Sequence, residues 1–112
     1  MPVIPIYSVK SPCKLKEYKE MSKGLSQIFQ TPRESIRFLW HKMPRGSFYN
    51  WGIISNTNAP LIQVYFRDRL RISAKRKALI YLSEYVSKLH KCDQKLTLVL
   101  FQKIELIFKI KC

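Results

Sequence analysis

Apolar side chains follow two different spacings along this chain, and each spacing predicts a different kind of element. Four short stretches are rich in β-branched and aromatic residues, often with every second residue apolar, which predicts strands. They are residues 3–9, 36–41, 61–66 and 96–101. Two longer stretches, residues 12–29 and 73–89, place apolar residues three or four positions apart and therefore predict amphipathic helices.

Local signals indicate where these elements begin. Ser11 and Pro12 favour a cap and a first residue for the first helix, and Ser73 favours a cap for the second. Gly24 weakens the first helix, because glycine has low helix propensity. Pro5 lacks a backbone donor, so it suits an edge strand or the beginning of a strand.

The segments between these elements combine turn formers with aromatic residues. We expect residues 43–52 to form a loop with a hairpin and residues 56–60 to form a second loop. The tail, residues 102–112, alternates apolar and charged positions, which suits either an added edge strand or a loose end. The aromatic residues that would pack the first loop are Phe48, Tyr49 and Trp51.

The order strand, helix, strand occurs twice, and the two halves match at their starts. At an offset of 58, the segment Pro2 to Tyr7 falls on Pro60 to Tyr65. Two β-α-β units with right-handed crossovers would form a four-stranded sheet with two helices on one face, an α+β fold. We expect residues 1–112 to form one domain, with halves at about 2–58 and 60–101.

Length and composition narrow the class of protein. With 112 residues and 46% apolar content, the chain can bury one core. It has no run of 18 uncharged apolar residues and no signal-peptide pattern, so we expect a soluble, cytoplasmic protein without a membrane span. Three distant cysteines predict free thiols, and His41 and His90 have no ligand partners at metal-site spacing, so no metal is expected.

Basic residues greatly outnumber acidic ones. Twenty-one Lys and Arg against seven Asp and Glu give a formal net charge of +14. Such a field attracts anions, whether a small carboxylate substrate, a nucleic acid or an acidic surface. Composition does not choose among these partners.

Pro2 is the residue with the most distinctive chemistry. If Met1 is removed, as is usual before a small residue, the Pro2 nitrogen becomes a secondary amine instead of an amide. A terminal amine has a reference pKa of about 7.7 to 8.0, and burial or nearby positive charge lowers it. Such an amine can serve as a general base near neutral pH. The alternative is that position 2 only tolerates a small residue at the start of a strand.

A small β-α-β duplication with proline at position 2 resembles the tautomerase superfamily, and within it the fused-subunit branch of cis-3-chloroacrylic acid dehalogenase. The resemblance covers residues 2 to about 101. It is carried by the proline start and by three internal segments. These are Met1-Pro2-Val3, Met43 to Gly46, Trp51-Gly52, and Val64 to Arg71 leading into Ser73-Ala74-Lys75.

The resemblance implies a catalytic proline and arginines that hold a substrate carboxylate at the start of the second helix. Pro2 matches the proline, and Arg69 is the best-placed arginine. The position of the second arginine falls on Ile72, with Arg71 and Arg67 close enough to replace it. The family further implies a homotrimer, no cofactor and a small anionic carboxylate as substrate.

The assisting residues of the dehalogenase branch are not matched. The position of its histidine falls near Leu25 and that of its tyrosine near Leu100, while Glu105 in the tail is out of register. The sequence therefore favours a keto-enol tautomerase, an isomerase, over a hydrolytic dehalogenase. In this interpretation Pro2 is the general base, and His41 could assist it or be structural.

Two other functions fit the sequence. One is a family member that kept the fold and lost the activity. The other is a basic nucleic-acid-binding module, supported by the net charge and by the exposed lysines of the first helix. Trp40, Tyr49 and Trp51 would then be stacking residues. No recognised DNA- or RNA-binding motif is present, so this alternative is not favoured.

Overall fold

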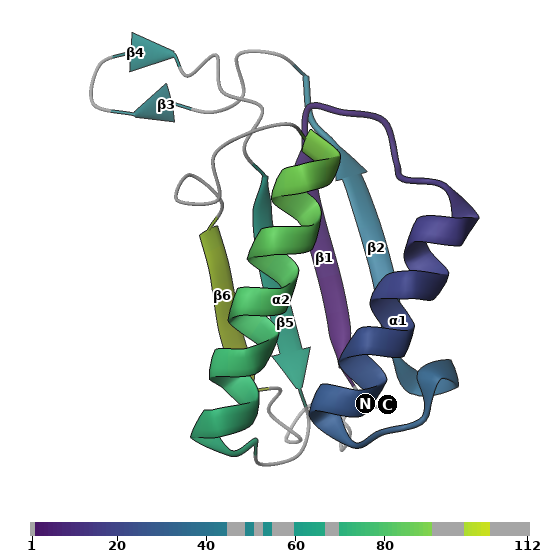
Figure 1. The fold of residues 1–112 in the computed structure, drawn as a ribbon. Helices are drawn as coiled ribbons and strands as arrows, with labels where there is room; N and C mark the ends of the chain where they lie inside the picture. The colour runs from purple at the N-terminus through teal and green to yellow at the C-terminus, as the bar shows by residue number, and fades with distance from the viewer. Residues whose placement is uncertain are drawn as a thin grey trace, which may run out of the picture.

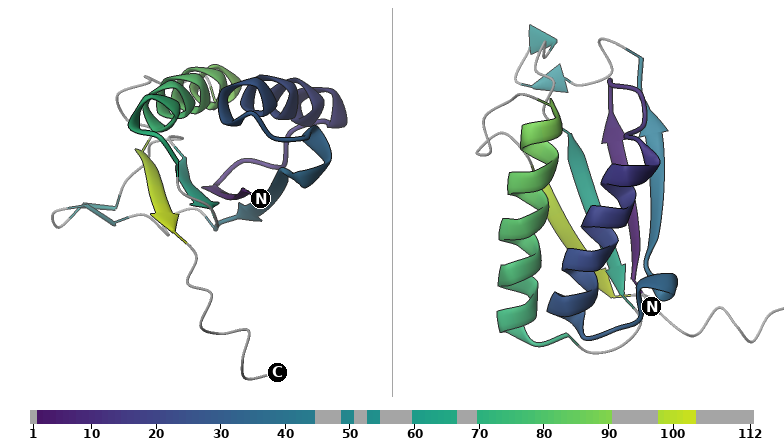
Figure 2. Two further views of the ribbon diagram at one scale, coloured as in Figure 1. Left: turned by 90° about the horizontal axis from the view of Figure 1, so that it is seen from below. Right: turned by 45° about the vertical axis from the view of Figure 1, so that its right-hand side comes forward.

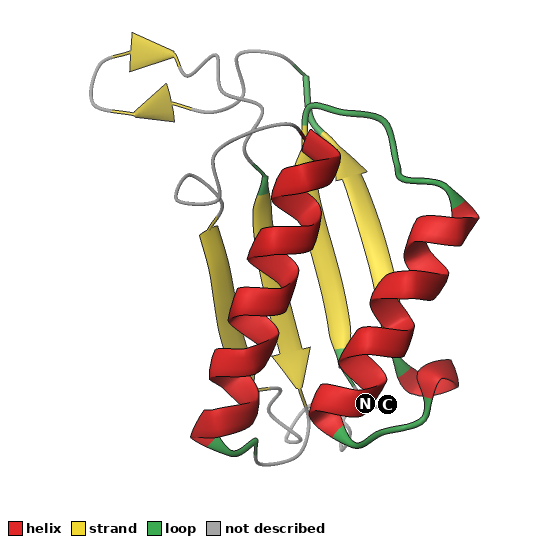
Figure 3. Ribbon diagram, viewed as in Figure 1, coloured by secondary structure: helices red, strands yellow, loops and turns green. Residues whose placement is uncertain are grey.

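Two β-α-β units build the fold in the computed structural model, which describes residues 2–44, 49–50, 53–54, 60–66, 70–90 and 98–103 (Figures 1 and 3). The elements in chain order are β1 (Val3–Ser8), α1 (Leu15–Phe29), the 3₁₀ helix η1 (Arg33–Ser35), β2 (Arg37–Lys42), β3 (Tyr49–Asn50), β4 (Ile53–Ile54), β5 (Leu61–Phe66), α2 (Ile72–His90) and β6 (Leu98–Lys103).

The main sheet has four strands in the order β2-β1-β5-β6. Each unit contributes a parallel pair, β1 with β2 and β5 with β6, and the two units meet where β1 and β5 run antiparallel. Both helices cover the same face of this sheet, as the view from below shows (Figure 2). The predicted fold, a duplicated β-α-β arrangement with two helices on one face, is confirmed.

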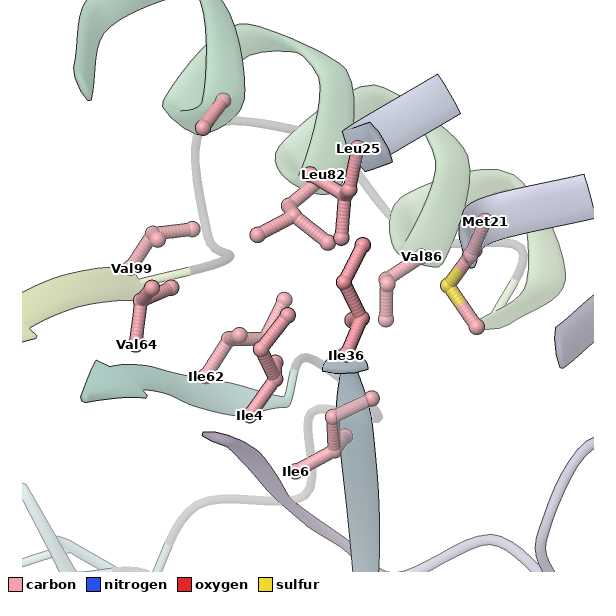
Figure 4. Packing of buried hydrophobic residues seen from close by; sticks show 11 residues of the cluster. Ile4, Ile6, Met21, Leu25, Ile36, Ile62, Val64, Leu82, Val86 and Val99 are labelled. Carbon is pink, nitrogen blue, oxygen red and sulfur yellow. The ribbon is translucent and has the colours of Figure 1, made fainter. Parts of the chain in front are cut away.

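The core lies between this face of the sheet and the helices. Inward residues of β1 and β5, such as Ile4 and Ile62, meet Leu25 of α1 and Leu82 of α2, and all four are fully buried (Figure 4). Full burial of one such side chain contributes about 1.5–3 kcal/mol to folding. The alternation of buried and partly exposed residues along β5 explains why its bounds, Leu61–Phe66, were predicted correctly.

The first helix begins later than the sequence suggested. It starts at Leu15, because the carboxylate of Glu17 accepts the backbone N–H of Lys14 at 2.7 Å and so caps the first turn. Ser11 is therefore not the cap. The second helix starts at Ile72, so Ser73 lies inside its first turn and the prediction of a serine cap there was also wrong.

Pro5 lies in a central strand, although we expected an edge or the start of a strand. It sits beside Leu39 of β2, while the pairs with β5 are made by Val3, Ile6 and Tyr7. The missing N–H of Pro5 falls between the paired positions of the β1–β5 ladder. A proline is tolerated there because it removes no donor that this part of the ladder uses.

The two helices contact each other closely at Gly24. A Cβ at this position would overlap the ring of Tyr81 on α2. The Tyr81 hydroxyl donates to the Glu20 carbonyl at 3.1 Å, and the Tyr85 hydroxyl donates to the Glu20 carboxylate at 2.5 Å. Gly24 therefore weakens α1 locally but permits this packing.

The remaining predicted segments are only partly described. A hairpin exists, with Tyr49–Asn50 antiparallel to Ile53–Ile54, so it extends two residues past the expected segment. The side chains of Phe48, Tyr49 and Trp51, residues 56–59 and the tail from 104 lie outside the described residues. The last strand was expected at residues 96–101 and is observed at Leu98–Lys103.

Candidate active site at the amino-terminal end of the sheet

Pro2 lies directly before β1, at the end of the sheet where β5 ends and α2 begins (Figure 1). It is buried, and its carbonyl accepts the backbone N–H of Arg37 at 3.0 Å. Val3 pairs with Tyr65 of the antiparallel strand β5. Continued by one residue, this register places Pro2 opposite Phe66, the last residue of β5.

Lys75 brings a positive charge to this end of the sheet. It lies in the first turn of α2, and its Nζ is 5.2 Å from the centroid of the Phe66 ring. An ammonium at this distance over an aromatic face is attracted by the ring quadrupole. The ring that holds the Lys75 ammonium is therefore also the neighbour of Pro2 in the sheet.

Arg71, one of the predicted substrate-binding residues, precedes α2 and is exposed. Its carbonyl accepts the Lys75 N–H at 3.1 Å, which closes the first turn. Arg71 lines a pocket of about 300 Å³ between the end of α1 and the start of α2, with Gln30, Ser73 and Lys77. The other two predicted arginines, Arg67 and Arg69, lie outside the described residues.

The charge at the start of α2 is unusual for a helix. Its first turn carries no acidic residue, whereas Arg71 lies just before it and Lys75 within it. The amino-terminal end of a helix already bears a partial positive charge, so cations there are unfavourable by themselves. Together these groups create a positive region that suits an anion.

His41 lies at the other end of the sheet from Pro2. It pairs in register with Tyr7, while Pro2 precedes Val3, so about 16 Å of strand separates the two residues. The His41 ring stacks on Tyr7 with 4.6 Å between centroids. The geometry within one chain therefore gives His41 no part in chemistry at Pro2.

A second polar cluster, which sequence reasoning missed, lies at that other end. The buried His90 Nδ1 is 2.7 Å from the Val86 carbonyl, and Nε2 is 2.6 Å from the Ser8 Oγ. With the Nδ1 proton donated to the carbonyl, Nε2 accepts the Ser8 hydroxyl proton. Ser8 Oγ also accepts the Lys10 N–H at 3.0 Å.

Every polar atom in this cluster has a partner, which indicates a structural role. Burial lowers the pKa of His90, and the nearby Lys10 ammonium lowers it further, so the neutral ring is favoured. Trp40 stacks on His90 with 5.7 Å between centroids and donates its Nε1–H to the Lys10 carbonyl at 2.9 Å. Because Ser8 and His90 are 82 residues apart, no local sequence pattern could reveal this pair.

Two properties of the described residues bear on other kinds of site. No group of three His, Cys, Asp or Glu side chains among them is arranged to hold a metal ion. None of the described helices is long and apolar enough to cross a membrane.

Solved structures with a similar fold share little sequence with this chain. A fused 4-OT wild-type asymmetric trimer matches with a TM-score of 0.79 at 16% identity, over 91% of this chain and 85% of that one. The chain has the tautomerase fold. The resemblance to the tautomerase superfamily expected from the sequence is thus confirmed at the level of the fold.

Two further structures show how widely this tautomerase fold is shared. Pt0534 inactivated by 2-oxo-3-pentynoate has a TM-score of 0.76 at 18% identity, over 91% of this chain and 85% of that one. N1, a member of the cis-3-chloroacrylic acid dehalogenase family, has a TM-score of 0.78 at 13% identity, over 91% and 74%. No family model and no curated protein matches the sequence.

Proposed function

We propose that this protein is a tautomerase-like isomerase whose general base is the amine of Pro2, formed when Met1 is removed. The observation that carries the proposal is that Pro2 and a cation both lie next to Phe66 at one end of the sheet. Pro2 lies opposite Phe66 in the β1–β5 register, and the Lys75 ammonium lies over the Phe66 ring. A base and a positive charge in one place suit proton transfer next to a carbonyl.

The proposed substrate is a small 2-oxo carboxylate that exchanges between keto and enol forms. The neutral Pro2 nitrogen takes a proton from the carbon next to the carbonyl, and the negative charge moves to the carbonyl oxygen. A cation stabilises this enolate, and Pro2 then returns the proton to the oxygen. Burial and nearby positive charge both disfavour a protonated amine. Pro2 is buried and lies opposite Phe66, and the Lys75 ammonium lies over the Phe66 ring.

The carboxylate of the substrate would be held by cations at the start of α2. By resemblance Arg69 is the best-placed arginine, with Arg71 and Arg67 as its neighbours. Arg71 is exposed and lines the pocket between the end of α1 and the start of α2, and Pro2 is not among the residues that line this pocket. Lys75 adds a further cation in the first turn of α2.

We further propose that the protein assembles as a homotrimer through the sheet face that the helices leave uncovered. Leu39 and Leu100 are 43% and 42% exposed, and the alternation of β2 and β6 directs them away from the helices. Exposed apolar residues across an open sheet favour association. Wild-type fused 4-OT, which has the same fold, forms trimers.

The proposal is tested with an enol assay. Intact mass first establishes whether Met1 is absent, and ketonisation of a phenylenolpyruvate-like substrate is then followed from about pH 5 to 9, a range that brackets the reference pKa of a terminal amine. We expect turnover that rises as a single group loses its proton. A matched variant with one extra residue before Pro2 keeps every side chain but converts the amine to an amide, and it should be inactive.

Two results would count against this function. Equal turnover by the extended variant would mean that Pro2 is not the base. A folded protein that lacks Met1 and turns over neither enol nor haloacrylate substrates would be a tautomerase-fold protein without the activity.

A further inference from the structure

A basic groove lies on the exposed face of α1 and reaches across to η1. Three exposed lysines, Lys16, Lys19 and Lys23, follow one another at intervals of three and four residues and so share one helix face. Arg33 of η1 closes the groove from the other side, where its guanidinium donates to the Lys19 carbonyl at 3.5 Å. The groove has a volume of about 440 Å³.

The positive charge of this groove is poorly neutralised. Glu20 is the one acidic residue that lines it, and its carboxylate is turned toward α2, where it accepts the Tyr85 hydroxyl at 2.5 Å. Within the described part of the chain, none of the three lysines forms an ion pair. Four cations therefore converge from two elements with no acidic partner among the described residues.

We propose that this groove binds the phosphodiester backbone of a nucleic acid without reading its sequence. From Lys16 to Lys23 the helix rises about 10 Å, so the lysines and Arg33 can contact several successive phosphates of one strand. Apart from Glu20, whose carboxylate accepts the Tyr85 hydroxyl, the groove is lined between the cations by Leu15 and the lysine stems. They offer no base-edge recognition, so contacts to phosphate position the partner and carry no sequence information.

The position of Trp40 argues against a binding mode based on stacked bases. Trp40, the described aromatic residue first considered for stacking, is half-buried, stacks on His90 and donates to the Lys10 carbonyl. It lies away from the groove, at the end of the sheet near Ser8. The groove is also separate from the Pro2 end of α2, so this inference does not depend on the proposed enzyme activity.

The number of cations in the groove determines how strongly the affinity for DNA should depend on salt concentration. Four phosphate contacts on duplex DNA give a slope of about −3.6 in a plot of log affinity against log salt, or about 150-fold weaker binding between about 50 and 200 mM salt. Removing three contacts should reduce the slope to about −0.9. A purely long-range effect of the net charge would not depend on which three cations are removed.

The test measures fluorescence anisotropy of a labelled random-sequence duplex over a range of salt, with three proteins. They are the wild type, the groove variant Lys16→Gln/Lys19→Gln/Lys23→Gln, and a control that removes three exposed cations elsewhere, Lys42→Gln/Arg76→Gln/Lys88→Gln. Circular dichroism checks that each is folded. We expect the groove variant to bind at least about tenfold more weakly at 50 mM salt and to lose most of the slope, while the control keeps it.

Three results would overturn the proposal. Equal loss of affinity and slope in both variants would assign the binding to net charge alone. Absence of duplex binding by the wild type at low salt would leave the groove without this partner. Binding to vesicles of mixed phosphatidylserine and phosphatidylcholine, without binding to the duplex, would assign the groove to an acidic membrane surface.

Discussion

Each end of the four-stranded sheet holds residues of types that often take part in catalysis, but the two ends differ in whether those residues have partners within the fold. At one end, Ser8 and His90 are buried and each polar atom has a hydrogen-bond partner. At the other end, Pro2 lies beside Phe66, with the Lys75 ammonium over the ring and no acidic residue in the first turn of α2. A serine hydrogen-bonded to a histidine resembles a catalytic pair, yet here the pair stabilises the fold. Uncompensated charge is the better sign of a functional site.

The largest expected effect is a loss of enol turnover when the amine at the Pro2 end is blocked. The variant with one residue added before Pro2 should lose about 10²–10⁴-fold in enol turnover, the usual contribution of a general base. Its free energy of unfolding should change by less than about 0.5 kcal/mol, because it removes no buried side chain. Urea unfolding and the enol assay on the same preparations check both expectations.

The next effect should appear in stability and not in activity. His90→Ala removes a buried ring and leaves Ser8 Oγ and the Val86 carbonyl without their partner, so we expect a loss of about 3 kcal/mol in unfolding free energy. Ser8→Ala should lose about 1–2 kcal/mol. If either folded variant lost enol turnover while keeping its stability, the Ser8–His90 end would be catalytic.

Lys75 provides a smaller test at the Pro2 end. Lys75→Met keeps most of the side-chain volume and removes the charge, so KM for an enol carboxylate should rise about tenfold, which corresponds to about 1.4 kcal/mol of binding. Lys88→Met, in the last turn of the same helix, is the matched control and should leave KM unchanged. An unchanged KM in Lys75→Met would remove this lysine from the site.

The smallest effect is a pH dependence of stability at the Ser8–His90 end. Because burial lowers the pKa of His90, the unfolded chain binds a proton more readily than the folded protein. The stabilisation is complete above the unfolded-state pKa of about 6.5, declines as the pH falls below it, and levels off below the folded pKa. Urea midpoints of wild type and His90→Gln between pH 5 and 8 isolate the pH-dependent contribution of His90 to stability. If the urea midpoints of the two proteins changed in parallel with pH, His90 would make no such contribution.

The sequence predicted the elements that depend on local periodicity. β5 was placed at its observed bounds, since its alternation reflects one buried face, and α1 was correctly ended at Phe29. The starts of both helices were misplaced. The first turn of α1 is capped by the Glu17 side chain and not by a serine, and Ser73 lies inside the first turn of α2 instead of just before it. Such ends depend on which of several side chains reaches the backbone.

The candidate site was predictable only in part. Pro2 stood out because its amine chemistry follows from its position in the sequence. The position of the Lys75 ammonium over the Phe66 ring could not be foreseen, because it depends on β5 ending opposite Pro2 and on α2 starting beside Phe66. The roles of Arg67 and Arg69 stay predictions. The partnership of Ser8 with His90 arises from the crossing of two units and has no local signature.

The central claim is that the Pro2 nitrogen is a free, reactive amine. 2-Oxo-3-pentynoate, the inactivator of Pt0534, is an electrophilic 2-oxo acid and provides a direct probe. After incubation with this compound near neutral pH, peptide mapping should find Met1 absent and one adduct on the peptide that begins at Pro2, and the extended variant should acquire none there. Retention of Met1, or an adduct confined to Cys13 or another thiol, would contradict the claim.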